Sequence, residues 1–181
     1  GVRSALTPRR DWEGQRLLLS AGPTQEPIDP VRYISNRSSG KMGYAIAQAA
    51  SKRGAQVVLV SGPTSLPPPR GVEVVPVETA EEMAKHMSTR LSWSTVVVMA
   101  AAVADFRPKH AAELKLKKRG KPTTTIDLEQ TTDILAALSA RRTTQVLVGF
   151  AAETHDLLTH AKAKLSSKGL DVIVANDVIL P

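Results

Sequence analysis

The residues best suited to bind and activate an anionic ligand lie in one long segment, 22–43, which follows the first apolar run of the chain. Ser38, Ser39 and Gly40 directly precede a stretch with helical spacing. Their N–H groups would therefore stand at a helix N-terminus, where free donors and the positive end of the helix dipole favour an anion. A capped helix with solvated basic residues is the alternative, but long loops between regular elements are more often functional. Three basic side chains flank this position: Arg32, Arg37 and Lys41.

Neither of the standard phosphate-binding motifs occurs in this segment. A dinucleotide fold turns from its first strand into its first helix through G-x-G-x-x-G, which is absent here. The string from Ser38 to Met42 resembles the end of a phosphate loop. However, no glycine lies five residues before Gly40, and Met42 occupies the place of the Mg²⁺-binding Ser or Thr. Any anion site must therefore be built differently.

A second group of interest is the small-residue stretch 100–105, at the end of another apolar run. Its alanines leave room for a flat or bulky ligand against the backbone, and Asp105 could bind ribose hydroxyls or a metal ion. Tight packing of a helix on the strand, with Asp105 as a cap, explains the same residues equally well.

Two further groups are rich in lysine. Residues 115–118 and 123–128 alternate in period two, which predicts a two-stranded flap over 113–128 that could close over a triphosphate. An edge strand protected by solvated lysines is the blander reading. The stretch 149–154 precedes a predicted helix that carries Lys162, Lys164 and Lys168. We count this group among the candidate binding residues, and a plain surface helix is the alternative interpretation. The histidines show no metal-ligand spacing and receive no role.

The elements that must position these groups follow from apolar periodicity. Short apolar runs alternate with helical patterns, which predicts an α/β domain with a Rossmann-like, mostly parallel sheet and helices on both faces. Ligands of such sheets lie beyond the carboxyl ends of the strands. The predicted strands are 16–20, 57–60, 72–77, 96–99, 146–149 and 170–174, and the predicted helices are 40–53, 79–91, 133–141 and 154–168.

Composition narrows the class of protein. A chain of 181 residues has the size of one domain, and its net charge of +7 favours anionic partners. With 3% aromatic residues it lacks the stacking platform expected of a single-strand binder, so small anions rank above nucleic acid. There are no cysteines, no apolar run long enough to cross a bilayer and no signal peptide. A cytoplasmic protein without membrane or nucleic-acid partners is the expectation.

Taken together, these segments resemble bacterial phosphopantothenate–cysteine ligase, often the C-terminal half of a bifunctional coenzyme A biosynthesis protein. The resemblance runs from about Arg16 to Val178. It implies CTP-dependent condensation of 4′-phosphopantothenate with L-cysteine through an acyl-cytidylate, with release of diphosphate and then CMP. The matching strings are AGPTQEPIDPVRYISNRSSGKMG at 21–43, AAAVAD at 100–105, KLKK at 115–118, VGFAAET at 148–154 and ANDV at 175–178.

The resemblance also implies roles for individual residues. Asn36 matches an asparagine that binds the acyl-cytidylate, Arg32 a position linked to the second half-reaction, and Lys115 the lysine needed to form the acyl-cytidylate. Mg²⁺ is expected on the triphosphate, near Asp105, because the sequence shows no metal cage. Besides the 38–40 anion position, the implied CTP contacts are Met99, Ala100, Ala101, Asp105, Lys115, Thr131, Thr132, Asp133, Ile134, Phe150, Lys164 and Lys168.

The family also implies a domain organisation. Residues 1–14 are interpreted as a linker from an upstream flavin-dependent decarboxylase, and 15–181 as the ligase domain. Family members continue past the position of Pro181, so a C-terminal tail is expected to be missing, and 131–134 lacks the proline that relatives carry before Asp-Ile. A homodimer is expected in which the lysine flap reaches the neighbouring site.

Two other functions remain as alternatives. An NAD(P)-dependent reductase could use the same fold, but G-x-G-x-x-G and a Tyr-x-x-x-Lys pair are both missing. A basic nucleic-acid-binding domain would show affinity that falls steeply with salt.

Overall fold

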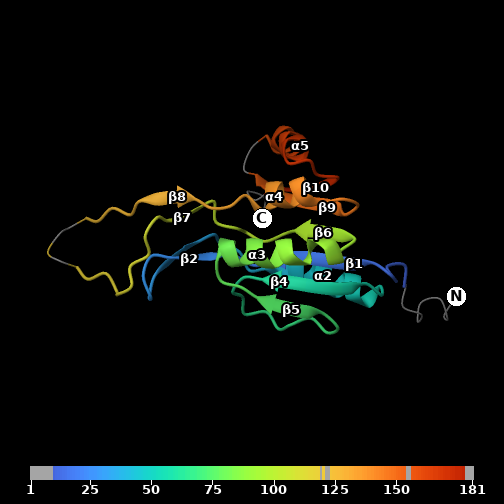
Figure 1. The fold of residues 1–181 in the computed structure, drawn as a ribbon, viewed down its shortest axis with the longest axis horizontal. Helices are drawn as coiled ribbons and strands as arrows, with labels where there is room; N and C mark the ends of the chain where they lie inside the picture. The colour runs from blue at the N-terminus through green and yellow to red at the C-terminus, as the bar shows by residue number, and fades with distance from the viewer. Residues whose placement is uncertain (1–9, 119, 121–122, 154–155, 178–181) are drawn as a thin grey trace.

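The computed structural model describes residues 10–118, 120, 123–153 and 156–177, and its centre is a six-stranded parallel sheet (Figure 1). The six strands predicted for this sheet all occur, and the Rossmann-like fold class is confirmed. In spatial order the strands are β5 (Glu73–Pro76), β4 (Gln56–Ser61), β1 (Arg16–Ala21), β6 (Val96–Met99), β9 (Val146–Glu153) and β10 (Val172–Asp177). The strand order reverses between β1 and β6, so this pair marks the switch point where doubly wound sheets bind ligands.

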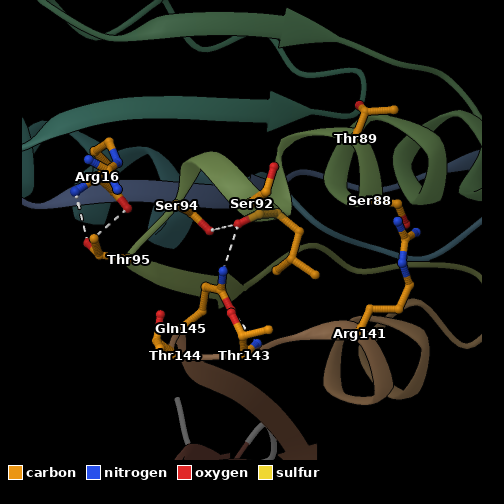
Figure 2. Close-up of a pocket in the computed structure, with 11 residues that line it drawn as sticks. Arg16, Ser88, Thr89, Ser92, Ser94, Thr95, Arg141, Thr143, Thr144 and Gln145 are labelled. Carbon is orange, nitrogen blue, oxygen red and sulfur yellow. Dashed lines mark hydrogen bonds between the residues drawn. The ribbon is translucent and has the colours of Figure 1, made fainter.

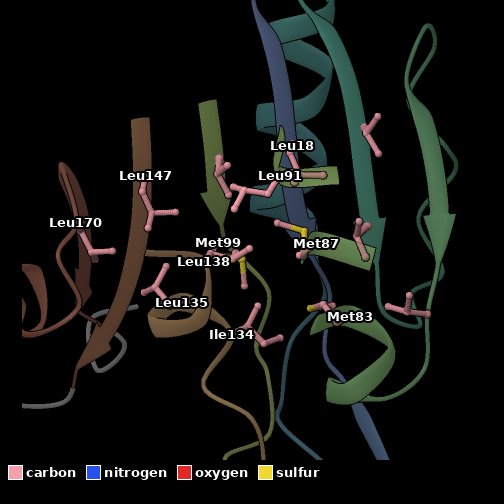
Figure 3. Close-up of a cluster of buried hydrophobic side chains, with 14 residues drawn as sticks. Leu18, Met83, Met87, Leu91, Met99, Ile134, Leu135, Leu138, Leu147 and Leu170 are labelled. Carbon is pink, nitrogen blue, oxygen red and sulfur yellow. The ribbon is translucent and has the colours of Figure 1, made fainter. Parts of the chain in front are cut away.

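Helices cover both faces of the sheet. One face carries α2 (Lys41–Lys52), and the other carries α3 (Ala80–Arg90), the 3₁₀ turn η1 (Leu91–Trp93), α4 (Ile134–Arg141) and α5 (Leu157–Ser167). In β1, Leu18 packs toward α3 and α4 while Leu17 and Leu19 pack toward α2. Both faces of the strand are buried, which is why it is a continuous apolar run. Figure 3 shows the α3/α4 side of this core, including Met83, Met87 and Leu138.

Local signals set the helix starts. Thr79 and Glu82 form a capping box at the start of α3, in which each side chain accepts a hydrogen bond from the other residue's backbone N–H. Asp133 caps α4 by accepting from the N–H of Ala136 at 2.9 Å. Gly40 precedes α2 with φ near 73°, a left-handed conformation that favours glycine. α5 begins at Leu157, and residues 154–155 of its predicted start lie outside the described residues.

The long segment 22–43 contains a hairpin that the sequence did not reveal. β2 (Gln25–Pro27) pairs with β3 (Tyr33–Ser35) in an antiparallel ladder. Each strand has only three residues, and a proline-containing turn separates them, so no periodic signal marks them. This hairpin leaves the sheet at its carboxyl edge and runs beside β7.

The predicted flap exists, but its strands lie elsewhere. β7 (Phe106–Pro108) and β8 (Leu128–Gln130) form the antiparallel ladder, so the prediction of strands at 115–118 and 123–128 was wrong. Leucine–lysine alternation suits a strand only where one side can be buried, and residues 115–118 are exposed throughout. We call β7, β8 and the segment between them the arm. Figure 1 shows it extending beyond one end of the sheet.

Part of the predicted N-terminal linker packs on the domain. Trp12 lies against the α2 side of the core, and the guanidinium carbon of Arg53 lies 5.3 Å from the centroid of its ring. Asp11 forms an ion pair with Arg53 at 2.6 Å. Residues 1–9 lie outside the described residues, and the interpretation of 1–14 as an interdomain linker stays a prediction.

Candidate functional site

The floor of the candidate site is backbone from the loops after β1 and β6. The N–H of Ala102 donates to the Gly22 carbonyl at 2.9 Å, and the N–H of Thr24 donates to the Ala102 carbonyl at 3.3 Å. The buried hydroxyl of Thr24 accepts from the N–H of Ala104 at 3.0 Å. The loops therefore continue the pairing of β1 and β6 past the ends of the strands and hold the two strand ends together at the switch point.

Glycines bring three loops into direct contact at this edge. A Cβ on Gly62 would stand 1.8 Å from the carbonyl oxygen of Pro23, and one on Gly40 would stand 3.3 Å from the Cα of Gly22. The backbones after β1 and β4 and before α2 therefore pack with no space for side chains. The N-terminus of α2 lies on this platform, where its first N–H groups can meet an anion.

Asn36 joins the two sides of the switch point. Its side-chain amide donates to the Val103 carbonyl at 2.9 Å, although the residue as a whole is exposed. Ser38 accepts a hydrogen bond from the N–H of Gly40 at 3.3 Å, and the carbonyl of Ser39 accepts one from Thr64 at 3.1 Å. Asn36 and the 38–40 turn thus lie at the same edge as the alanine stretch, as the sequence predicted.

The stretch after β6 presents its backbone to the site. The side chain of Met99 is buried in the core, so only its main chain can face a ligand (Figure 3). The N–H of Ala101 already donates to the Ser20 hydroxyl at 3.2 Å. Asp105 is exposed, and its carbonyl accepts from the N–H of Thr131 at 3.0 Å. The predicted contacts at 99–101, 105 and 131 therefore come together in one place.

A cluster of opposite charges lies beside β9, close in sequence to Thr131. Lys168 forms an ion pair with Asp133, and the ammonium of Lys164 donates to the Phe150 carbonyl at 2.8 Å. Burial raises the pKa of Asp133, but the hydrogen bonds from Lys168 and the Ala136 N–H outweigh it and leave that pKa lowered. Thr132 is exposed, whereas the side chain of Ile134 is buried in the core and can offer a ligand only its backbone.

Arg32 and Lys115 lie on a second structure, formed by the β2–β3 hairpin and the arm. Arg32 donates to the Leu116 carbonyl at 2.8 Å, so this arginine stands next to Lys115 along the arm. Asp29, which sequence reasoning missed, accepts from the N–H of Leu116 at 3.0 Å and forms an ion pair with Arg32. The hydrogen bond from Arg32 is the main reason that the pKa of Asp29 lies well below its usual range.

One signal in the sequence could have identified Asp29. It is followed by Pro30 and then by Val31 and Arg32, and an Asp in such a turn typically accepts hydrogen bonds from the N–H groups two and three residues on. The structure has both of these bonds, at 2.9 Å each.

Hollows occur at both edges of the sheet. A polar cavity of about 380 Å³ lies at the amino edge, and Figure 2 shows Arg16 and Arg141 on opposite sides of it. A second, of about 570 Å³, lies at the carboxyl edge and is lined by Tyr44, Ser61 and Thr64 among others. Only the second lies at the edge where doubly wound sheets bind ligands. Within the described ranges, no cluster of three acidic or histidine side chains could hold a metal ion, and no helix could span a membrane.

Comparisons with known proteins give a consistent result. The model of the DNA/pantothenate metabolism flavoprotein C-terminal domain matches residues 12–180. The coenzyme A biosynthesis bifunctional protein CoaBC of Bacillus subtilis (strain 168) is 48% identical over 167 residues, which cover 92% of this chain and 41% of that protein. The protein of the same name from Mycobacterium tuberculosis (strain H37Rv) is 49% identical over 179 residues, covering 93% and 43%. The chain therefore spans less than half the length of these relatives.

Solved structures give the same result for the fold. The crystal structure of the C-terminal domain of CoaBC has a TM-score of 0.82 and 47% identity, covering 91% of this chain and 78% of that one. The DNA/pantothenate metabolism flavoprotein from Streptococcus pneumoniae has a TM-score of 0.79 at 22% identity, covering 92% and 83%. At 22% identity, the similarity to the Streptococcus pneumoniae protein concerns the fold alone.

Proposed function

Because the chain belongs to the DNA/pantothenate metabolism flavoprotein C-terminal domain family, we propose that it is a phosphopantothenate–cysteine ligase domain of coenzyme A biosynthesis. It joins 4′-phosphopantothenate and L-cysteine at the expense of CTP, through an acyl-cytidylate, and releases diphosphate and CMP. The observation that carries the proposal is the family match over 12–180, and the meeting of Asn36, the 38–40 turn and the alanine stretch at the switch point supports it.

The first half-reaction needs a positive charge at the α-phosphate. The carboxylate of phosphopantothenate attacks this phosphorus, the bond to the diphosphate breaks, and negative charge builds on the phosphoryl oxygens. Lys115, an exposed cation on the arm, would stabilise that charge. In the second half-reaction the amine of cysteine attacks the acyl carbon and CMP leaves with the electron pair of the broken bond. Asn36 and Arg32 would hold the acyl-cytidylate for this attack.

The nucleotide would lie along the carboxyl edge from β6 to β9. Backbone groups of 99–101 would contact the base. Asp105 follows them in the same loop and would bind the ribose or Mg²⁺. A single exposed carboxylate fits Mg²⁺ that is held mainly by phosphate oxygens. Lys164 and Lys168 would reach the phosphates on exchanging their present partners, Phe150 and Asp133.

A dimer would bring the two parts of the site together. Arg32 and Lys115 lie on the hairpin and arm, which project from the sheet edge that carries Asn36 (Figure 1). The same projection exposes large apolar side chains, with Leu114 80% exposed, and such patches mark protein interfaces. A second copy of this chain would cover them while its own site receives the arm. These side chains are Val31, Tyr33, Phe106, Leu114, Leu116 and Leu128.

The bifunctional names of the relatives concern longer proteins. We propose that a flavin-dependent decarboxylase domain precedes residues 1–14 in the full protein, that the domain continues past Pro181, and that the enzyme works in the cytoplasm.

A diphosphate-release assay tests the function. Release should occur with CTP and phosphopantothenate and should exceed release with ATP, whereas CMP should accumulate only when cysteine is added. Lys115→Gln should stop diphosphate release, and Asn36→Asp should allow it but leave the acyl-cytidylate unconsumed. Lys85→Gln, at an exposed position of α3, is the matched control. Equal loss of diphosphate release in Lys115→Gln and Asn36→Asp would contradict this division of roles, and micromolar binding of NADPH would revive the reductase alternative.

A further inference from the structure

Asp29 is an almost completely buried carboxylate in the turn between β2 and β3, with 3% of its surface exposed. Its two oxygens have different partners. Oδ1 accepts from the N–H groups of Val31 and Arg32, at 2.9 Å each, and so closes the turn. Oδ2 accepts from the Arg32 guanidinium and, at 3.0 Å, from the N–H of Leu116. One oxygen therefore stabilises the local turn, and the other reaches a segment 87 residues away in the chain.

The arm is held at both main-chain groups of Leu116. Asp29 accepts from its N–H, and Arg32 donates to its carbonyl at 2.8 Å. A further bond joins the N–H of Ala112 to the Ile28 carbonyl at 2.9 Å. These contacts fix the backbone on which Lys115 stands, although residues 115–118 form no strand ladder. A lysine on an otherwise unpaired segment loses entropy when it is aimed at a substrate, and this anchoring lowers that cost.

We propose that Asp29 is a positioning residue, which fixes the backbone of the arm at Leu116 and thereby aims Lys115 at the phosphoryl group in acyl-cytidylate formation. This inference rests on the proposed function. The bond from Arg32 lowers the pKa of Asp29, so the carboxylate is ionised at neutral pH and can accept from every donor that surrounds it.

Asp29→Asn breaks the hydrogen bonds on one of the two sides of this carboxylate. An amide has one acceptor oxygen and one NH₂ group, so it cannot accept on both sides, and the NH₂ must face either the turn amides or Leu116 and Arg32. Asp171→Asn is a matched control, because Asp171 also accepts from a backbone N–H, that of Leu147 at 2.8 Å, and pairs with an arginine, Arg142. It lies at the amino end of β10, away from the arm.

The test uses the 181-residue chain with CTP and phosphopantothenate and without cysteine. Asp29→Asn should slow the burst of diphosphate by about tenfold or more, the scale set by one hydrogen bond to a charged group, with little change in the KM for CTP. Asp171→Asn should stay within about twofold of wild type. Trypsin should also cleave after Lys115 faster in Asp29→Asn than in Asp171→Asn, which reports on the backbone without any substrate.

The possible outcomes distinguish a failure of the positioning role of Asp29 from a failure of the proposed function. Equal burst rates and equal tryptic cleavage in the two variants would overturn the positioning role, as would a defect confined to the cysteine-dependent step. If wild type released no diphosphate, the proposed function would fail, and the tryptic comparison would still decide the anchoring. If Asp29→Asn does not fold, amide exchange in wild type decides it. The Leu116 N–H should then exchange more slowly than those of Lys115 and Lys117, and equal rates would overturn the anchoring.

Discussion

Gly62 offers the sharpest steric test of the close packing between the loops after β1 and β4. A Cβ at this position would stand 1.8 Å from the carbonyl oxygen of Pro23, and contacts below 3.0 Å are essentially never adopted by real Cβ atoms. The backbones after β1 and β4 must therefore separate by about 1.2 Å in Gly62→Ala. Its φ is not in the left-handed region, so the penalty is one of packing and not of backbone strain.

Overpacking of this kind costs about 1–3 kcal/mol. In a domain of this length each kcal/mol lowers the Tm by about 2–4 °C, so we expect Gly62→Ala to lower it by roughly 2–12 °C. We expect the rate of diphosphate release to fall by more than the loss of folded protein alone would explain. Pro23 precedes Thr24, which holds Ala102 and Ala104, and a displacement of about 1 Å in a reacting site can cost on the order of 100-fold in rate.

Gly149→Ala is the matched control, because its Cβ would also be crowded, at 2.6 Å, but by the end of the Leu170 side chain. A side chain can turn away where a carbonyl cannot, so Gly149→Ala should lower the Tm less and leave diphosphate release close to wild type. Thermal unfolding and the diphosphate assay measure both effects. A Gly62→Ala protein with wild-type Tm and wild-type rate would refute the reasoning, and so would equal losses in the two variants.

Three further predictions concern other parts of the molecule. Asp171 has a lowered pKa, chiefly because its carboxylate accepts a hydrogen bond from the Leu147 N–H. Its contribution to stability is therefore present above the ordinary carboxyl pKa near 4 and is lost as the pH falls through the lowered value. The Tm difference between wild type and Asp171→Asn should accordingly shrink from about pH 5 to about pH 2. Leu114→Lys should weaken a dimer by about tenfold or more in sedimentation velocity, whereas Leu158→Lys, on α5 and 71% exposed, should not. Lys168→Ala should raise the KM for CTP several-fold, and an unchanged KM would remove Lys168 from the nucleotide site.

The sequence predicted the sheet and its helices well because both depend on burial. Each strand of the sheet needs an apolar run, and α3 has a capping box that is visible in its residues. The hairpin β2–β3 could not be predicted in the same way, since its ladder is three residues long and its stability comes from distant contacts such as that of Glu26 with the N–H of Ala80. The strands of the arm were misplaced because alternation of Leu and Lys is also compatible with an exposed, irregular segment.

The roles predicted for Asn36, Lys115 and the alanine stretch stay predictions. The sequence placed Lys115 on a flap apart from the segment 22–43, and in the structure Asn36 lies at the sheet edge while Lys115 lies on the arm. Sequence spacing could not show how the hairpin and the arm meet, because these segments come from distant parts of the chain. Asp29 was missed for a related reason: its partner Leu116 is 87 residues away, and only the turn beside it is visible in the sequence.

If the proposed function holds, the division of the candidate residues between the sheet edge and the arm has a chemical consequence. Groups at the sheet edge are fixed by backbone pairing, with Gly22, Ala102 and Thr24 locked to one another, and they suit a ligand that must be held through both half-reactions. Lys115 is exposed on an arm that is fastened through Leu116, and it suits a charge needed only while diphosphate leaves. If both tasks were served by the rigid edge, a lysine there would bind the triphosphate and the cytidylate alike, and uniform binding does not accelerate the chemical step. In the proposed reaction, a cation that the arm holds at the phosphoryl group would act mainly on activation, and the anchoring of Leu116 by Asp29 would fix where it acts.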